Sequence, residues 1–150
     1  MEGVLQEADV PLKERVSRIN SRCAALGKEN VILVSIHANA AGNGREWTKP
    51  RGWSVYTSKG QTKADLLADD LARAAMKYLG SKAVRGDFAD GDIDYEEGFY
   101  ILKHTISPAV LTENLFFTEQ ECHWLMTEEA IEAIAMTHVE GIAGYLLAST

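Results

Sequence analysis

The chain has 150 residues, 46% of them hydrophobic and 25% charged, which suits one globular domain. Its net charge is −7 and its basic residues are scattered among acidic ones, so we expect no nucleic acid partner. No apolar run is long enough to cross a bilayer, so we expect no membrane span. The first residues lack the basic start and apolar core of a secretion signal, and they leave the location of the protein open.

The first two predicted elements are a helix and a strand. Apolar residues recur every three or four positions from Pro11 to Leu26, which predicts an amphipathic helix that ends at Gly27. Residues 31–36 then form a short apolar run without polar alternation. Such a run is typical of a parallel strand covered on both faces, so we expect it in the centre of a sheet.

A loop, a second strand and a second helix follow. Residues 42–52 have the composition of a loop, and residues 52–57 show the alternation and aromatic content of a strand. Leucines and alanines restore the helical period from Thr62 to Leu79. We expect Thr62 to cap this helix and Gly80 to end it.

The last part of the chain contains a polar loop, two strands and a helix. Residues 85–98 are rich in acidic side chains but lack the pattern of a calcium-binding EF-hand loop, so we expect a solvated loop. Short runs at 99–102 and 109–112 predict two strands, separated by a Ser-Pro turn. Residues 127–147 predict a long closing helix.

This order of helices and strands predicts an α/β fold with three layers, α/β/α, around a mostly parallel sheet. Residues 1–150 form a single domain in this interpretation, and the chain begins with a helix where a strand is normally expected. Cys23 and Cys122 lie in apolar, helix-like sequence without a metal-binding spacing. We therefore expect both to be free, buried thiols rather than a disulfide.

Two of the predicted strands end on residues that can do chemistry. The run VILVSIH ends at His37, with Asn39 two residues later, and the run AVLTEN ends at Glu113 and Asn114. Functional residues of open α/β sheets gather at the carboxyl ends of the strands, and parallel neighbours would bring these side chains together. An imidazole that holds Zn²⁺ and a carboxylate that takes a proton from water suit metal-assisted hydrolysis.

A structural interpretation of the same residues stays open. In it, His37 is a strand-end histidine bonded to a backbone carbonyl, and Glu113 is a solvated strand terminus. His104 lies in the turn before the last strand, where it either reaches the same crevice or is simply exposed. His123 and His138 fall in helical sequence far from any ligand spacing, so we expect both to be structural.

Several segments resemble one known family. SIHANA (residues 35–40), PAVLTEN (108–114) and VEGI (139–142) resemble zinc-dependent N-acetylmuramoyl-L-alanine amidases of the amidase_3 type. The segment PLKERVSRIN is similar to the L-x-x-R-x-x-x-x-N helix of that family. The resemblance covers nearly the whole chain.

The resemblance implies a fold, a reaction and residue roles. The fold is α/β of the phosphorylase/hydrolase-like kind, and the reaction hydrolyses the amide between N-acetylmuramic acid and the L-alanine of the peptidoglycan stem peptide. His37 is then a Zn²⁺ ligand, and Glu113 is the catalytic carboxylate that activates water and passes its proton to the leaving amine. Asn39, His104 and Asn114 are then expected to contact the substrate or to support these two residues.

The sequence departs from the family pattern at its start. Family members begin with a strand that ends in a G-H-G motif, whose His is a zinc ligand, and carry a Glu ligand on the next helix. Because a catalytic zinc site takes three protein ligands, we expect an amino-terminally truncated amidase domain that alone binds zinc weakly and has little or no activity. A missing first strand also exposes a sheet edge, so we expect self-association.

Two other functions stay open. A non-catalytic module that binds peptidoglycan or a partner would keep the crevice and lose the metal, and the missing ligands favour it. Another zinc hydrolase acting on peptides would share the strand-end chemistry. The retained His37 and Glu113 favour an amidase over the first function, and the SIHANA and ENLFF segments favour it over the second.

Overall fold

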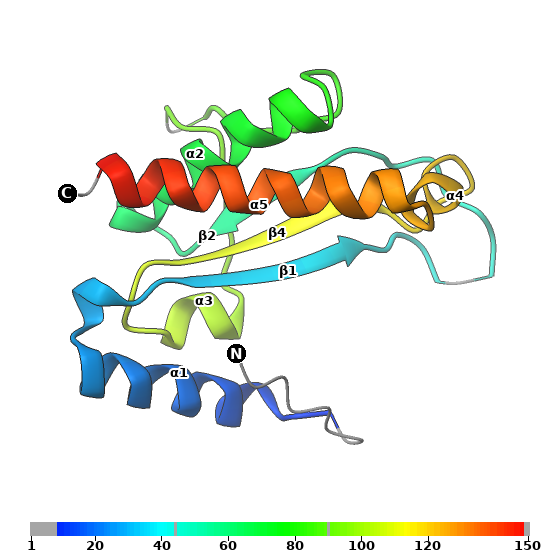
Figure 1. Cartoon of the computed structure of the whole chain (residues 1–150). Coiled ribbons are helices and arrows are strands. Elements are labelled where there is room, and N and C mark those ends of the chain that lie inside the picture. Colours follow the sequence, from blue (N-terminus) through cyan, green and yellow to red (C-terminus); the bar gives the residue numbers. More distant parts are fainter. Residues whose placement is uncertain (1–8, 44, 90, 149–150) are drawn as a thin grey trace.

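The fold is a four-stranded sheet between two layers of helices, as Figure 1 shows. The computed structural model describes residues 9–43, 45–89 and 91–148. The strand order is β1-β4-β2-β3, with bounds β1 Leu33–Asn39, β2 Ser54–Thr57, β3 Tyr95–Glu96 and β4 Ala109–Phe116. β1 pairs with β4 and β2 with β3 in parallel, whereas β2 and β4 are antiparallel. The predicted α/β layers are confirmed, and the sheet is mixed.

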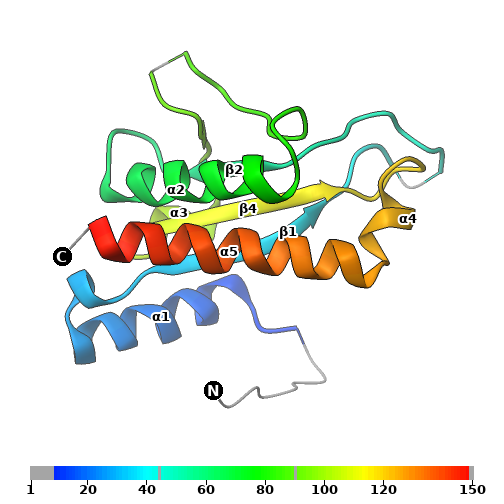
Figure 2. The same ribbon diagram turned by 45° about the horizontal axis from the view of Figure 1, so that its top comes forward.

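Helices cover both faces of this sheet. Their bounds are α1 Leu12–Leu26, α2 Lys63–Tyr78, α3 Tyr100–His104, α4 Cys122–Leu125 and α5 Glu128–Ala148, with a short 3₁₀ turn at Lys28–Asn30. α1 and α3 lie on one face, and α2 and α5 lie side by side on the other (Figure 2). The three long helices match the predicted ranges. Thr62 caps α2 as expected, with Asp65 completing a capping box.

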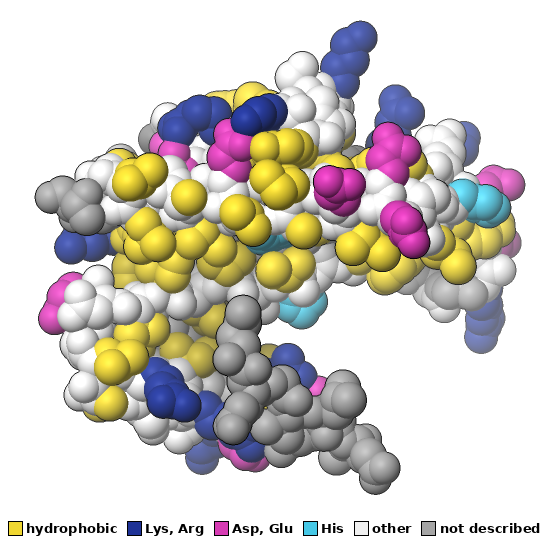
Figure 3. All heavy atoms as spheres, viewed as in Figure 1, with side chains coloured by type: hydrophobic (Ala, Val, Ile, Leu, Met, Phe, Trp, Pro, Cys, Tyr) yellow, Lys and Arg dark blue, Asp and Glu magenta, His cyan; other side chains and the backbone are white. Residues whose placement is uncertain are grey.

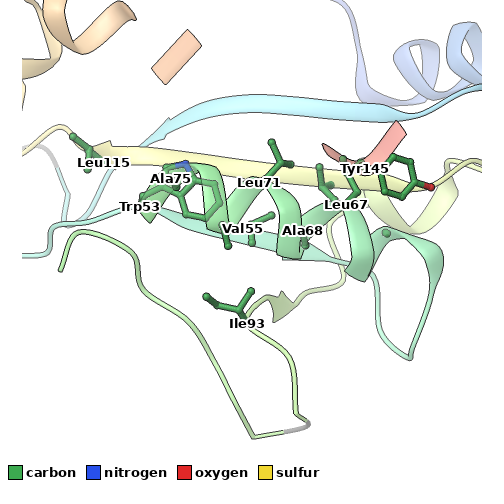
Figure 4. Packing of buried hydrophobic residues seen from close by; sticks show 12 residues of the cluster. Trp53, Val55, Leu67, Ala68, Leu71, Ala75, Ile93, Leu115 and Tyr145 are labelled. Carbon is green, nitrogen blue, oxygen red and sulfur yellow. The ribbon is translucent and has the colours of Figure 1, made fainter. Parts of the chain in front are cut away.

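The larger part of the core lies between the sheet and the α2/α5 layer. Trp53, Val55, Leu67 and Leu71 are fully buried there, as the close-up in Figure 4 shows. α5 crosses α2 closely, because a Cβ atom built on Gly141 would lie 2.8 Å from Leu71 Cα. A side chain at residue 141 would therefore push the two helices apart.

Three sequence predictions are wrong. Residues 99–102 were expected to be a strand, but residues 100–104 form α3, whose Ile101 and Leu102 pack in the core between α1 and the sheet. Four apolar residues suit either element, and tertiary packing decides between them. β1 lies at an edge of the described sheet rather than at its centre. The predicted loop at 85–98 contains β3, the shortest strand.

The acidic segment at residues 85–98 is not fully solvated, contrary to the prediction. Asp94 is only 2% exposed, and its Oδ2 accepts a hydrogen bond of 2.5 Å from the Thr57 hydroxyl. Asp87 is exposed as expected, and Asp90 lies outside the described residues. Cys23 and Cys122 are free thiols, as predicted, but only Cys23 is buried. Among the described helices, none is both long and apolar enough to span a bilayer.

Candidate active site

The candidate site is centred on a pair of residues in neighbouring strands. His37 of β1 and Glu113 of β4 face each other in register at the carboxyl ends of these parallel strands. On the other side of β4, Ser54 of β2 pairs with Glu113. Because side chains alternate along a strand, His37, Glu113 and Ser54 form a row across the sheet on the face that α1 and α3 cover. The expected meeting of His37 and Glu113 is confirmed.

His37 is exposed, at the end of this row that lies on the edge strand β1. Its Nε2 atom and Ser35 Oγ, which lies two residues earlier on the same face, are hydrogen-bonded at 2.9 Å. The ring is therefore bonded to a hydroxyl rather than to the backbone carbonyl of the structural interpretation. A single hydroxyl partner leaves the imidazole accessible to a ligand or an ion.

Glu113 sits deeper than His37. Its Oε2 atom is buried and has no hydrogen-bond partner among the described residues. Burial raises the pKa of the Glu113 carboxyl. A carboxyl group with a raised pKa and an unpaired oxygen is suited to accept a proton and to return it. Sequence reasoning predicted Glu113 but missed Ser54, because nothing in the strand SVYT marks a serine as special.

Asn114 holds the backbone of the site rather than facing solvent. It is 2% exposed, and its Nδ2 donates to the His37 carbonyl at 2.8 Å and to Thr112 Oγ1 at 3.1 Å. Its Oδ1 accepts a hydrogen bond of 2.9 Å from Trp53 Nε1. Asn114 therefore ties the end of β1 to β4 and to the start of β2, and it supports His37 through the main chain.

The network under the site continues into α5. His138 is buried, and its Nδ1 lies 2.7 Å from the Ile134 carbonyl, which can only accept, so Nδ1 carries the proton. Nε2 then accepts from the Thr112 hydroxyl at 2.9 Å. Burial lowers the pKa of His138 and keeps the ring neutral. His138 is thus structural, as predicted, but it is bonded to the residue that precedes Glu113.

The remaining predicted site residues lie in different places. Asn39 ends β1 beside the pair, where its carbonyl accepts a hydrogen bond of 2.8 Å from the Phe117 amide. His104 ends α3, before β4 begins, and its ring contacts Tyr100 with the centroids 4.2 Å apart. Because Glu113 lies near the other end of β4, the structure does not bring His104 to the pair.

The side chains of His37 and Glu113 are of types that bind zinc, but the described residues provide too few ligands for a catalytic zinc site. An accessible imidazole and a carboxylate with an unpaired oxygen are ligand types that zinc prefers. Within the described residues, however, no group of three or more His, Cys, Asp or Glu side chains is placed to hold a metal ion. Since a catalytic zinc takes three protein ligands, the described residues supply only part of such a site.

The sequence matches a known family over most of its length. Residues 4–144 match the Amidase_3 family, described as N-acetylmuramoyl-L-alanine amidase. The endolysin of Bacillus phage SPP1 is 36% identical over 118 residues, which cover 77% of this chain and 40% of the endolysin. The chain therefore spans less than half of the length of this relative.

The fold agrees with solved amidases. The N-acetylmuramoyl-L-alanine amidase from Clostridium difficile 630 has a TM-score of 0.76 at 24% identity, over 99% of this chain and 72% of that one. Ami1 from Mycobacterium smegmatis has a TM-score of 0.73 at 19% identity, over 98% of this chain and 65% of that one. At such identities the likeness concerns the fold alone. Sequence and fold thus agree, and the chain belongs to the Amidase_3 family of N-acetylmuramoyl-L-alanine amidases.

Proposed function

We propose that this chain provides the catalytic strands of a peptidoglycan amidase that hydrolyses the amide between N-acetylmuramic acid and L-alanine. The observation that carries the proposal is the His37 and Glu113 pair, in register at the carboxyl ends of β1 and β4. An amide is a poor electrophile with a poor leaving group. A Lewis acid and a group that moves a proton together address both problems.

Glu113 is the group that moves the proton. It takes a proton from the attacking water and passes it to the nitrogen that leaves as the amino group of L-alanine. Its raised pKa supports this cycle, because a partly buried carboxyl holds the accepted proton more readily than a solvated one. Its unpaired Oε2 supports the cycle as well, because no protein donor among the described residues competes for that oxygen.

His37 would hold a zinc ion with its accessible imidazole. Such an ion, when bound, supplies the Lewis acid that polarises the scissile carbonyl. We propose that ligands other than the described residues complete its coordination, and that the chain alone retains zinc weakly. After dialysis against zinc-free buffer, elemental analysis should find well under one zinc per chain. Stoichiometric zinc with His37 as a ligand would contradict this proposal.

A non-catalytic peptidoglycan-binding module is the second candidate. The observation that favours it is the incomplete donor set among the described residues, because a fold that has lost its metal can keep its binding crevice. This candidate predicts that the chain pellets with insoluble peptidoglycan and releases nothing from it at any zinc concentration.

Product analysis separates these functions. Purified peptidoglycan is incubated with the chain in excess zinc or in a chelator, and new amino termini and reducing sugar ends are measured. The amidase proposal expects slow release of L-alanine amino termini that requires zinc, with no new reducing ends. Release of other amino termini would instead indicate a zinc peptidase, and release that the chelator leaves unchanged would contradict the zinc proposal.

A further inference from the structure

Leu115 has a backbone conformation that its side chain disfavours. Its φ angle is +66°, and it is the one non-glycine residue with positive φ among the described residues. The left-handed region is disfavoured for a residue with a Cβ atom, because that atom lies too close to the following carbonyl oxygen. Leu115 is also buried, and it lies two residues after Glu113. Strain of this kind persists only where the surroundings enforce it, and it clusters at functional sites.

The strained residue forms a bulge at the end of β4. His37 pairs with Glu113, but Asn39 pairs with Phe116, so the register shifts by one residue between the two pairs. The extra residue lies on β4. Bulges bend a strand and re-aim the side chains beside them. Glu113 is the last residue of β4 in the regular register with β1.

Glu121 fixes the far side of this bulge. Its Oε2 accepts a hydrogen bond of 2.8 Å from the Phe116 amide, directly after Leu115. Its Oε1 and Oε2 lie 3.0 and 3.2 Å from the Gly52 amide nitrogen, which donates to the same carboxylate. One carboxylate thus joins the end of β4 to the segment that enters β2. On the near side, Asn114 is bonded to the His37 carbonyl.

We propose that Glu121 is a positioning residue, which holds Leu115 in its strained conformation and thereby fixes the orientation of the Glu113 side chain. This inference rests on the proposed function, because a fixed orientation of the Glu113 side chain matters only if Glu113 takes part in the reaction. Without the carboxylate, Leu115 relaxes toward extended backbone, and the bulge that frames Glu113 is lost. The Glu113 side chain then samples several rotamers.

Side-chain couplings measured by NMR on the whole chain test this directly. In the wild type, a strong NOE between the amide and Hα protons of Leu115 must report the short separation that a positive φ imposes, and the α–β couplings of Glu113 must report one χ1 rotamer. E121Q and E121A are expected to give averaged Glu113 couplings. E119Q is the matched control, because Glu119 is exposed and its substitution removes the same charge two residues away from Glu121. It is expected to match the wild type.

A rescue variant distinguishes positioning from simple support. Glycine adopts positive φ without cost, so L115G in the E121A background should restore a single Glu113 rotamer, although the loss of the buried leucine lowers stability. If the Glu113 couplings of the E121A and L115G double variant remain averaged, the role assigned to the strain at Leu115 is contradicted. If E121A does not fold, E121Q, which keeps the side-chain volume, decides the matter.

Some outcomes overturn the proposal outright. A negative φ at Leu115 in the wild type does so, as does a single Glu113 rotamer in folded E121Q and E121A, even if both unfold at lower temperature. None of these readouts uses amidase activity. If the wild type is inactive on peptidoglycan but E121Q shows averaged Glu113 couplings, the proposed function is contradicted and the positioning role of Glu121 stands.

Discussion

Glu113 and Asp94 are among the carboxyl groups that burial pushes toward their protonated form, and only Glu113 belongs to the candidate site. Glu113 lies beside His37, and Asp94 lies directly before β3. Burial is the largest cause in both cases. For Asp94, nearby Asp92 and Asp65 add to the effect, and the hydrogen bond from Thr57 opposes it. A perturbed carboxyl marks a site only when its geometry also suits chemistry.

Asp94 gives a pH-dependent prediction. Its pKa is raised to about 6 in the folded chain from 3.8. Since the fold favours the neutral carboxyl, this stabilisation is complete below pH 3.8 and is lost as the pH rises through about 6. D94N keeps a neutral group and an oxygen that accepts from Thr57. We therefore expect D94N to be about 1–3 kcal/mol more stable than the wild type near neutral pH.

Urea unfolding at several pH values measures this difference. The gain of D94N should vanish below pH 3.8, where Asp94 is protonated in both states. D87N is the matched control, because Asp87 is an exposed carboxyl on the same loop, and it should show no such trend. A D94N variant that is less stable than the wild type above pH 6 would refute the assignment.

At the scale of elements, β4 carries the candidate catalytic residue on one face and the residues that support it on the other. Glu113 points to the α1/α3 face, whereas Thr112 and Asn114 point to the other face and bond to His138 of α5 and to Trp53. This follows from the period of two along a strand. The site thus depends on packing between β4 and α5 as well as on its own residues.

His138 makes that packing sensitive to acid. Burial lowers its pKa below 6.5, so the neutral ring stabilises the fold above pH 6.5, and this contribution is lost as the pH falls toward the lowered pKa. H138Q keeps an oxygen that accepts from Thr112 and cannot be protonated. We expect H138Q to lose less stability than the wild type between about pH 7 and pH 5.

Thermal or urea unfolding at these two pH values checks the prediction. H123Q is the control, because His123 is exposed on α4, and it should keep the pH dependence of the wild type. If H138Q and the wild type lose the same stability in acid, His138 is not the group responsible.

The sequence predicted the elements that rest on local signals. Apolar period and caps located the long helices, and the strand-end rule placed His37 beside Glu113. It could not place α3, because four apolar residues suit a helix or a strand until Ile101 and Leu102 find their neighbours. It missed Glu121 because the partners of this carboxylate, the Phe116 and Gly52 amides, are brought together only by the fold.

At the scale of the whole molecule, the sheet of the described residues has β1 at one edge and β3 at the other. β1 is an edge strand of the described sheet, and its Ile36 is 56% exposed. Figure 3 shows hydrophobic side chains gathered along α5. Exposed apolar residues on α5 include Ile131, Val139 and Leu146. An open strand edge beside apolar side chains favours association with another chain.

We therefore predict self-association that depends on β1. Light scattering at about 100 µM protein should give a mass above the 16.5 kDa of one chain. I36K should reduce this mass, because a lysine on an edge strand opposes pairing. F88K is the matched control, since Phe88 is similarly exposed on the loop before β3, at the opposite edge of the sheet from β1, and it should have no effect. A wild-type chain that scatters as a monomer would contradict the prediction.

Glu113 is proposed to perform the proton transfer of a peptidoglycan amidase, and a comparison of Glu113 variants with the wild type tests this role. Release of L-alanine amino termini from purified peptidoglycan is measured in excess zinc for the wild type, Glu113→Ala, E113Q and E119Q. Removing a general acid and base typically costs about 100-fold or more in rate, so both Glu113 variants should lose the release while E119Q keeps it. If E113Q releases L-alanine amino termini as fast as an active wild type, Glu113 does not perform the proton transfer.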